Sequence, residues 1–228
     1  MASLKFCANI SWLFTELPEF GERMRAAVCA GFQAVEAAWL YESDLRELSR
    51  VREQTGLTVA LINTPPGDVK NGELGLGAVP GREQEFRQGL TQAVHYAKAL
   101  DCKRIHVMAG RVPAGQRRSE VGLEMETTFV QNLRYAADVL SKDLFHWQIM
   151  DGNLTKNIQK YLPLIGHVQV AQVPDRHEPD SPGELNYSYI FNLLERLGYQ
   201  GYVGCEYKPS GSTEEGLGWV KKYWKGQN

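Results

Sequence analysis

The sequence predicts an α/β fold, a (β/α) barrel built on parallel strands. Short apolar runs alternate with amphipathic helical stretches at roughly thirty residues per strand–helix unit, and no hairpin signal separates the runs. The chain has 228 residues, of which 43% are hydrophobic and 23% charged, which is enough for one domain with a sizeable core. Because strands joined by helical crossovers pair in parallel with one hand, a barrel accommodates this order.

The first half of the chain contains four such units in regular succession. Gly31 and Gly56 are placed to end the first two helices, and Ser43 is placed to cap the start of the second. The loop Thr64–Gly81 is long for a compact domain, which is typical of a functional loop. The expected strands are Leu4–Ile10, Gln33–Trp39, Leu57–Asn63 and Arg104–Ala109, and the expected helices are Phe20–Ala30, Ser43–Thr55, Arg82–Leu100 and Glu120–Leu140.

The second half does not keep this rhythm. After Leu140 the chain runs through Asp143 directly into Leu144, with no apolar run long enough for a strand. Two strands follow, at His167–Val173 and Gly201–Glu206, and three helices, at Leu154–Leu162, Tyr187–Leu197 and Glu214–Trp224. Six strands are about two units short of a closed eight-stranded barrel. We therefore expect one domain over residues 1–228, an incomplete or open barrel interrupted near residues 140–146.

The composition of the chain argues against several classes of protein, including those that bind nucleic acids or membranes. The net charge of −2 argues against a nucleic-acid partner or an anionic membrane surface, and no apolar stretch is long enough to span a bilayer. The four cysteines are scattered, which favours reduced core thiols in a cytoplasmic protein. The start of the chain has no long apolar segment of the secretory type. Phosphate loops, nucleophile elbows and paired metal motifs are absent from the sequence.

Glu206 is the foremost candidate for chemistry, because it ends the last expected strand. The carboxyl ends of parallel strands are where α/β folds place their active sites. A glutamate in this position can equally form an ion pair with a neighbouring lysine or arginine. Proton transfer normally requires a second acid or base, or a metal. Asn63 ends the third strand, where its amide could bind a substrate oxygen or cap the following turn.

Three further segments carry polar groups that could join Glu206. Period-two alternation places His167 and Gln169 on one face of their strand, where a barrel interior would require polar partners for both. Arg176 could bind a carboxylate through its guanidinium, or lie in a solvated charged loop. His146 lies between two aromatic residues and could contact a ligand or be a hydrogen-bonded core residue.

Five segments together resemble the hydroxypyruvate isomerase family, which belongs to the xylose-isomerase-like barrels. The resemblance extends from Leu4 to Trp224 and is specific, because the segments match in order. They are Asn63–Asp68, Ile105–Gly110, Phe145–Gln148, His167–Ala171 and Gly204–Tyr207.

The resemblance implies an intramolecular oxidoreductase that interconverts hydroxypyruvate and 2-hydroxy-3-oxopropanoate (tartronate semialdehyde). Two carboxylates would move a proton through an enediol, and a divalent ion, Mg or Mn, could polarise the carbonyl. Carried over to this sequence, Glu206 matches the second catalytic glutamate and a metal ligand. The implied substrate contacts are His146 and Arg176, beside Asn63, and the implied further metal ligands are Gln169 and Asp143.

One departure from the family is decisive for this expectation. The family has a strand ending in Leu-Glu-Pro-Ile-Asn, whose glutamate is the first catalytic carboxylate, and this chain lacks that strand, its helix and the next strand. An excised block of this kind is typical of a splice variant or of an error in the gene model. We expect a marginally stable protein with impaired isomerase activity. The alternatives are a catalytically inactive binding or regulatory protein, which could associate with a full-length copy, and, more distantly, a sugar epimerase or abasic-site nuclease.

Overall fold

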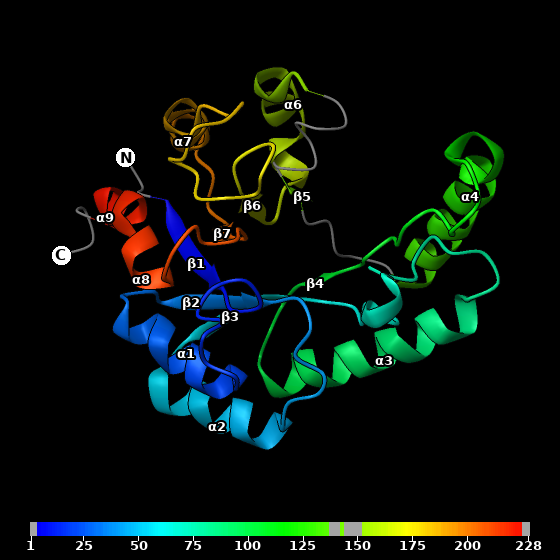
Figure 1. The fold of residues 1–228 in the computed structure, drawn as a ribbon, viewed down its shortest axis with the longest axis horizontal. Coiled ribbons are helices and arrows are strands. Elements are labelled where there is room, and N and C mark those ends of the chain that lie inside the picture. The colour runs from blue at the N-terminus through cyan, green and yellow to red at the C-terminus, as the bar shows by residue number, and fades with distance from the viewer. Residues whose placement is uncertain (1–3, 137–141, 144–151, 225–228) are drawn as a thin grey trace.

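The computed structural model describes residues 4–136, 142–143 and 152–224. Seven parallel strands form one sheet in the order β4-β3-β2-β1-β7-β6-β5. The sheet is strongly curved, and the helices lie along its outer side (Figure 1). The strands are β1 Lys5–Asn9, β2 Ala34–Ala37, β3 Thr58–Asn63, β4 Ile105–His106, β5 Lys142–Asp143, β6 Val168–Val170 and β7 Tyr202–Cys205.

Helices connect the strands as a (β/α) fold requires. The α-helices are α1 Phe20–Cys29, α2 Leu45–Thr55, α3 Glu83–Ala99, α4 Arg118–Ala136, α6 Leu154–Tyr161, α7 Tyr187–Arg196, α8 Thr213–Gly216 and α9 Gly218–Trp224. Two 3₁₀ turns, η1 Val69–Asn71 and η2 Leu162–Leu164, accompany them. No helix in the described part of the chain is long and apolar enough to cross a membrane.

The sheet does not close. β4 and β5 are its two end strands, and within the described residues no ladder joins them. The prediction of an incomplete parallel barrel is therefore confirmed. The six predicted strands are all present, although several are shorter than expected. A seventh strand that the sequence did not reveal precedes Leu144: Lys142 and Asp143 pair with Val168 and Gln169 as β5, which is only two residues long and is not an apolar run.

Alternation along β1 separates an apolar exterior from a polar interior. Phe6 faces the helices and packs edge-on against Phe191 of α7 and Trp219 of α9, with ring centroids 5.6 and 5.5 Å apart. Cys7 and Asn9 point to the opposite face and contact a glutamate of β2. The interior of the curved sheet is therefore where this sequence places its buried polar groups.

Two local predictions need correction. Asp44, not Ser43, caps α2, since its side chain accepts a hydrogen bond from the backbone N–H of Arg46 at 2.9 Å. Of the four cysteines, all free thiols, three are buried as expected, but Cys29 at the end of α1 is exposed. Gly56 ends α2 as predicted, with a left-handed φ of 70°.

Candidate active site

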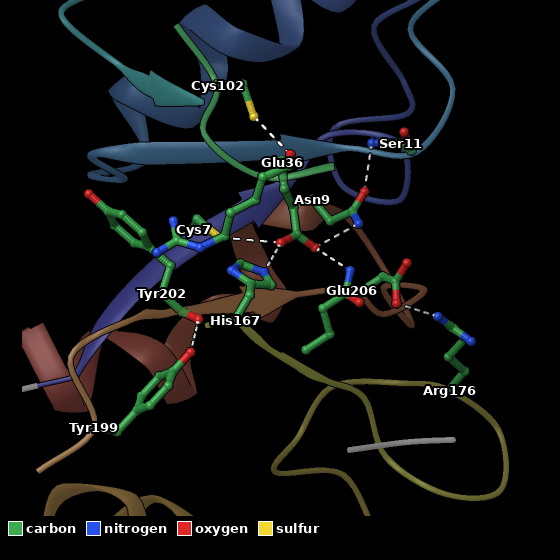
Figure 2. Close-up of polar contacts among 12 residues, drawn as sticks. Cys7, Asn9, Ser11, Glu36, Cys102, His167, Arg176, Tyr199, Tyr202 and Glu206 are labelled. Atoms are coloured by element: carbon green, nitrogen blue, oxygen red, sulfur yellow. Dashed lines mark hydrogen bonds and ion pairs between the residues drawn. The ribbon is translucent and has the colours of Figure 1, made fainter. Parts of the chain in front are cut away.

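Glu206 lies immediately after β7, at the carboxyl end of the sheet, with its side chain 9% exposed. Arg176 reaches it from the loop after β6, and Nη2 of Arg176 lies 2.6 Å from Oε2 of Glu206. The guanidinium also lies over the ring of Trp12, 5.0 Å from its centroid. The structure thus brings together two residues that the sequence singled out separately, and the ion pair that was the alternative for Glu206 is present (Figure 2).

The fold holds Arg176 against Glu206 through its backbone as well as its side chain. Arg176 has a positive φ of 58°, which is uncommon outside glycine. Its N–H donates to the carbonyl of Gln172 at 2.8 Å, and its carbonyl accepts from the N–H of Lys208, also at 2.8 Å. The loops that follow β6 and β7 are therefore fastened to each other beside the carboxylate.

Glu36 of β2 is the centre of a buried network that sequence reasoning missed. Its side chain is fully buried and accepts four hydrogen bonds, which fill the four lone-pair positions of a carboxylate. Oε1 accepts from Nδ2 of Asn9 at 2.9 Å and from Nε2 of Gln169 at 2.8 Å. Oε2 accepts from Sγ of Cys7 at 3.5 Å and from Nε2 of His167. Figure 2 shows these contacts, from β1, from β6 and from His167 just before β6, converging on one carboxylate.

Electrostatics favour the ionised form of Glu36. Burial alone raises the pKa of this carboxyl, but His167 and the amide donors of Gln169 and Asn9 together outweigh burial and lower its pKa below the ordinary value. Burial, together with the nearby charge of Glu36, raises the pKa of the Cys7 thiol well above its usual range. Cys7 is thus a protonated donor to a charged acceptor.

Gly204 of β7 provides the space for this network. A Cβ atom on Gly204 would lie 2.3 Å from Oε2 of Glu36, closer than real Cβ contacts allow. Because Gly204 is adjacent to Gln169 in the β6–β7 ladder, the gap falls beside the amide that donates to Glu36. The prediction that His167 and Gln169 face a polar interior is confirmed, and Glu36 is the partner that both require.

The remaining predicted site residues lie along the same end of the sheet. Asn63 is buried at the end of β3, and its carbonyl accepts from the hydroxyl of Tyr41. In the sheet, Asp143 of β5 pairs with Gln169 of β6, and Gln169 pairs with Gly204 of β7. Glu206 lies two residues beyond Gly204 along the chain. Two of the three expected metal ligands therefore belong to the adjacent strands β5 and β6, and the third, Glu206, follows the next strand, β7. His146 lies outside the described residues.

The donor set of this region can be compared with what a divalent metal requires. Oε1 of Gln169 is buried and has no hydrogen-bond partner among the described residues, so an oxygen ligand is available there. A second group is formed by Cys7, Glu36 and His167, whose ligand atoms all lie within 4.8 Å of one another. In that group Glu36 is already saturated by protein donors, whereas the Gln169 oxygen is not.

Proton transfer shared with Glu206 would require a second carboxylate. Besides Glu206, the buried acids among the described side chains are Glu36 and Glu178. Glu36 is saturated and fully buried. Glu178 accepts from the N–H of Ser210 at 2.9 Å and from its hydroxyl at 2.7 Å, a contact that fastens two loops. Neither is available as a base, so the described part of the site offers no second carboxylate for the reaction.

The sequence has close relatives among known proteins. It matches the family "Xylose isomerase-like TIM barrel" in two parts, residues 24–142 and 140–223. It is 61% identical to "Putative hydroxypyruvate isomerase" of Danio rerio over 271 aligned positions, covering 100% of this chain and 98% of the relative. It is 40% identical to "2-oxo-tetronate isomerase" of Haemophilus influenzae and 37% identical to "Hydroxypyruvate isomerase" of Escherichia coli, covering 96% of this chain and 99% of each relative.

Solved structures resemble the fold as well. The "AP endonuclease, family 2" of Brucella melitensis superposes with a TM-score of 0.86 at 42% identity, covering 96% of this chain and 99% of that one. The 3-keto-D-glucoside 4-epimerase of E. coli superposes with a TM-score of 0.70 at 18% identity, covering 97% and 100%. With the predicted family confirmed by relatives that match over nearly their whole length, this chain belongs to the xylose-isomerase-like TIM-barrel family and, within it, to the hydroxypyruvate isomerases, which are isomerase enzymes.

Proposed function

We propose that this chain is a form of hydroxypyruvate isomerase. It retains the residues that would bind the substrate and one catalytic carboxylate, but its turnover is strongly reduced. The observation that carries the proposal is Glu206, a buried carboxylate at the end of β7 that Arg176 holds, in a site whose described side chains offer no second carboxylate for proton transfer. The names of its relatives support hydroxypyruvate as the substrate, with other small 2-keto acids such as 2-oxo-tetronate as the next candidates.

The proposed chemistry follows from the groups at this end of the sheet. Arg176 would bind the substrate carboxylate, and the amide of Asn63 would contact a substrate oxygen; His146 is a further proposed contact. Glu206 would accept a proton from C3 of hydroxypyruvate and return it to C2 of the enediol, while the hydroxyl proton passes from the oxygen on C3 to the oxygen on C2. With a single carboxylate, the same group must perform both transfers on one face of the substrate. General acid–base groups typically contribute 10²- to 10⁴-fold each, so we expect a rate lower by about that factor.

A divalent cation is a proposed cofactor of this site. Gln169, Asp143 and Glu206 would hold it, and when bound it would polarise the substrate carbonyl. The unpartnered oxygen of Gln169 among the described residues supports this assignment. The ion pair with Arg176 opposes it in part, because a cation at Glu206 must share the carboxylate with the guanidinium.

The loss of an internal segment accounts for the missing carboxylate. The alignment with the Danio rerio relative spans 271 positions, which is 43 more than the 228 residues of this chain. The two family matches meet at residues 140–142, where the predicted rhythm of strands and helices breaks. Both observations support a block of sequence absent from this point, as a splice variant would produce.

The four free thiols support a cytoplasmic location.

An isomerase assay tests the proposal. The purified chain, its Glu206→Gln variant and the Danio rerio relative would be compared for conversion of hydroxypyruvate to 2-hydroxy-3-oxopropanoate, with and without Mn²⁺. We expect the chain to be slower than the relative by about 10²- to 10⁴-fold. Turnover equal to that of the relative and abolished by Glu206→Gln would contradict the proposed impairment. No turnover in any condition would favour the alternative, an inactive binding protein.

Abasic-site cleavage is the second candidate function, because the Brucella melitensis protein is named an AP endonuclease. Proteins that bind DNA neutralise phosphates with clustered lysine and arginine. This chain has 25 basic and 27 acidic residues, and its net charge is −2. We therefore place the nuclease below the isomerase, and cleavage of an abasic duplex by the purified chain would reverse that order.

A further inference from the structure

Glu36 lies across the interior of the sheet from Gln169, with β1 and β7 between their strands. The carboxylate nevertheless reaches the amide, because Gly204 of β7 has no side chain in the way. Contacts with Cys7 and Asn9 of β1 hold the carboxylate from the other side. Glu36 thus ties together β1, β2 and β6 directly beneath the level of Glu206.

The chemistry of a carboxylate determines how its amide partners are oriented. An ionised carboxylate accepts hydrogen bonds and donates none, so the group of Gln169 that faces Oε1 is the NH₂. The same holds for Asn9, whose other amide atom, Oδ1, accepts from the N–H of Ser11 at 3.1 Å. In Gln169 the oxygen is consequently the amide atom turned away from Glu36, and it is buried without a partner among the described residues.

We infer that Glu36 is a positioning residue, which makes Gln169 present an acceptor oxygen to the ligand of this site. The subsite therefore takes an electron-poor group, either a divalent cation or a substrate hydroxyl, and excludes an anionic oxygen. Without the negative acceptor at Glu36, the amide could rotate by half a turn and present its NH₂ instead. The orientation follows from the hydrogen bond between Gln169 and the ionised carboxylate of Glu36, whereas the identity of the ligand rests on the proposed function.

Nuclear magnetic resonance of the glutamine side chains tests this orientation. The chain would be labelled with ¹⁵N at glutamine, and the NH₂ signal of Gln169 assigned by its loss in Gln169→Met. We expect its protons to exchange with water at least about tenfold more slowly than those of the exposed Gln54, because they are buried and hydrogen-bonded. This measurement needs only the unaltered chain: if the NH₂ protons of Gln169 exchange as fast as those of Gln54, the inference is overturned.

Matched variants separate the positioning role from a general effect on the fold. Glu36→Gln retains the shape of the side chain but removes the charge, and we expect the Gln169 signal to shift and lose its slow exchange. Glu178→Gln alters another buried acid, which accepts two hydrogen bonds from Ser210, and should leave the signal unchanged. An unchanged Gln169 signal in Glu36→Gln would overturn the inference.

Binding of Mn²⁺, followed by electron paramagnetic resonance, identifies the ligand class. If the oxygen of Gln169 binds a cation, Glu36→Gln and Gln169→Met should weaken Mn²⁺ binding by similar factors, and the double variant should be no weaker than either. If the unaltered chain binds no Mn²⁺ while the Gln169 signal is protected, the metal part of the proposed function fails and a substrate hydroxyl is the assigned ligand. A protected signal together with Mn²⁺ binding that is indifferent to both substitutions also assigns the hydroxyl.

Discussion

A single carboxylate, Glu36, organises the polar interior of this protein. A buried charge is costly unless it is paired and fully hydrogen-bonded. Glu36 meets that condition with four donors, Cys7 and Asn9 of β1, Gln169 of β6 and His167 immediately before β6. The same saturation excludes Glu36 from proton transfer, so this buried acid is a scaffold for the site and not part of the reaction.

Gly204→Ala should destabilise the protein. The new Cβ would lie 2.3 Å from Oε2 of Glu36 and 2.6 Å from its Cδ, and the carboxylate cannot move without losing its donors. We expect the free energy of unfolding to fall by about 1–3 kcal/mol, as measured by urea denaturation followed by circular dichroism.

Gly218→Ala is the matched control for this substitution, because nothing lies within 4 Å of a Cβ at Gly218. Its effect should stay within roughly 0.5 kcal/mol of zero. Equal stability of Gly204→Ala and Gly218→Ala would contradict the close packing of Glu36 over β7.

At the scale of the element, the sequence predicts the existence and type of the strands and helices better than their ends. The apolar runs and the glycine stops located all six principal strands because those signals are local. β5 escaped prediction because two residues carry no periodicity, and they form a strand only by pairing with β6. Tertiary pairing, which local pattern cannot reveal, decides such short elements.

The site shows the same division between local and distant signals. Glu206, Gln169 and Arg176 were recognisable from their positions at strand ends and in a charged loop. Glu36 was not, because a glutamate in a short apolar strand is unremarkable until its partner is known. That partner, His167, lies 131 residues along the chain. The ion pair between Arg176 and Glu206 likewise depends on two loops meeting in space.

Asp44→Ala should weaken the start of α2. Its carboxylate accepts the N–H of Arg46, which would otherwise lack a partner in the first turn. The expected loss is about 1 kcal/mol, with a range of 0.5–2 kcal/mol for caps of this kind. Ser43→Ala, at the neighbouring position that the sequence favoured, should change stability much less. Thermal denaturation of the two variants distinguishes them, and an equal loss in both would contradict the assignment of Asp44 as the cap.

At the scale of the whole molecule, the open sheet is the feature that separates this chain from a closed barrel. A curved sheet with two ends leaves backbone groups of β4 and β5 without the neighbours that closure provides. The large core on the outer side, including Phe6, Phe191 and Trp219, does not depend on closure. We therefore expect that the N-terminal and C-terminal strands fold together around β1 even where the barrel is incomplete.

We propose that the chain retains an isomerase site and lacks one carboxylate of that site because an internal segment is missing. The most direct test is a chimera in which the corresponding segment of the Danio rerio relative is inserted at residues 140–142, where the two family matches meet. Its hydroxypyruvate isomerase rate would be measured beside that of the original chain and of the chimera carrying Glu206→Gln. We expect the chimera to be faster than the original chain by about 10²- to 10⁴-fold, and this gain to be lost again with Glu206→Gln. A chimera that folds but is no faster than the original chain, or that is indifferent to Glu206→Gln, would contradict this proposal.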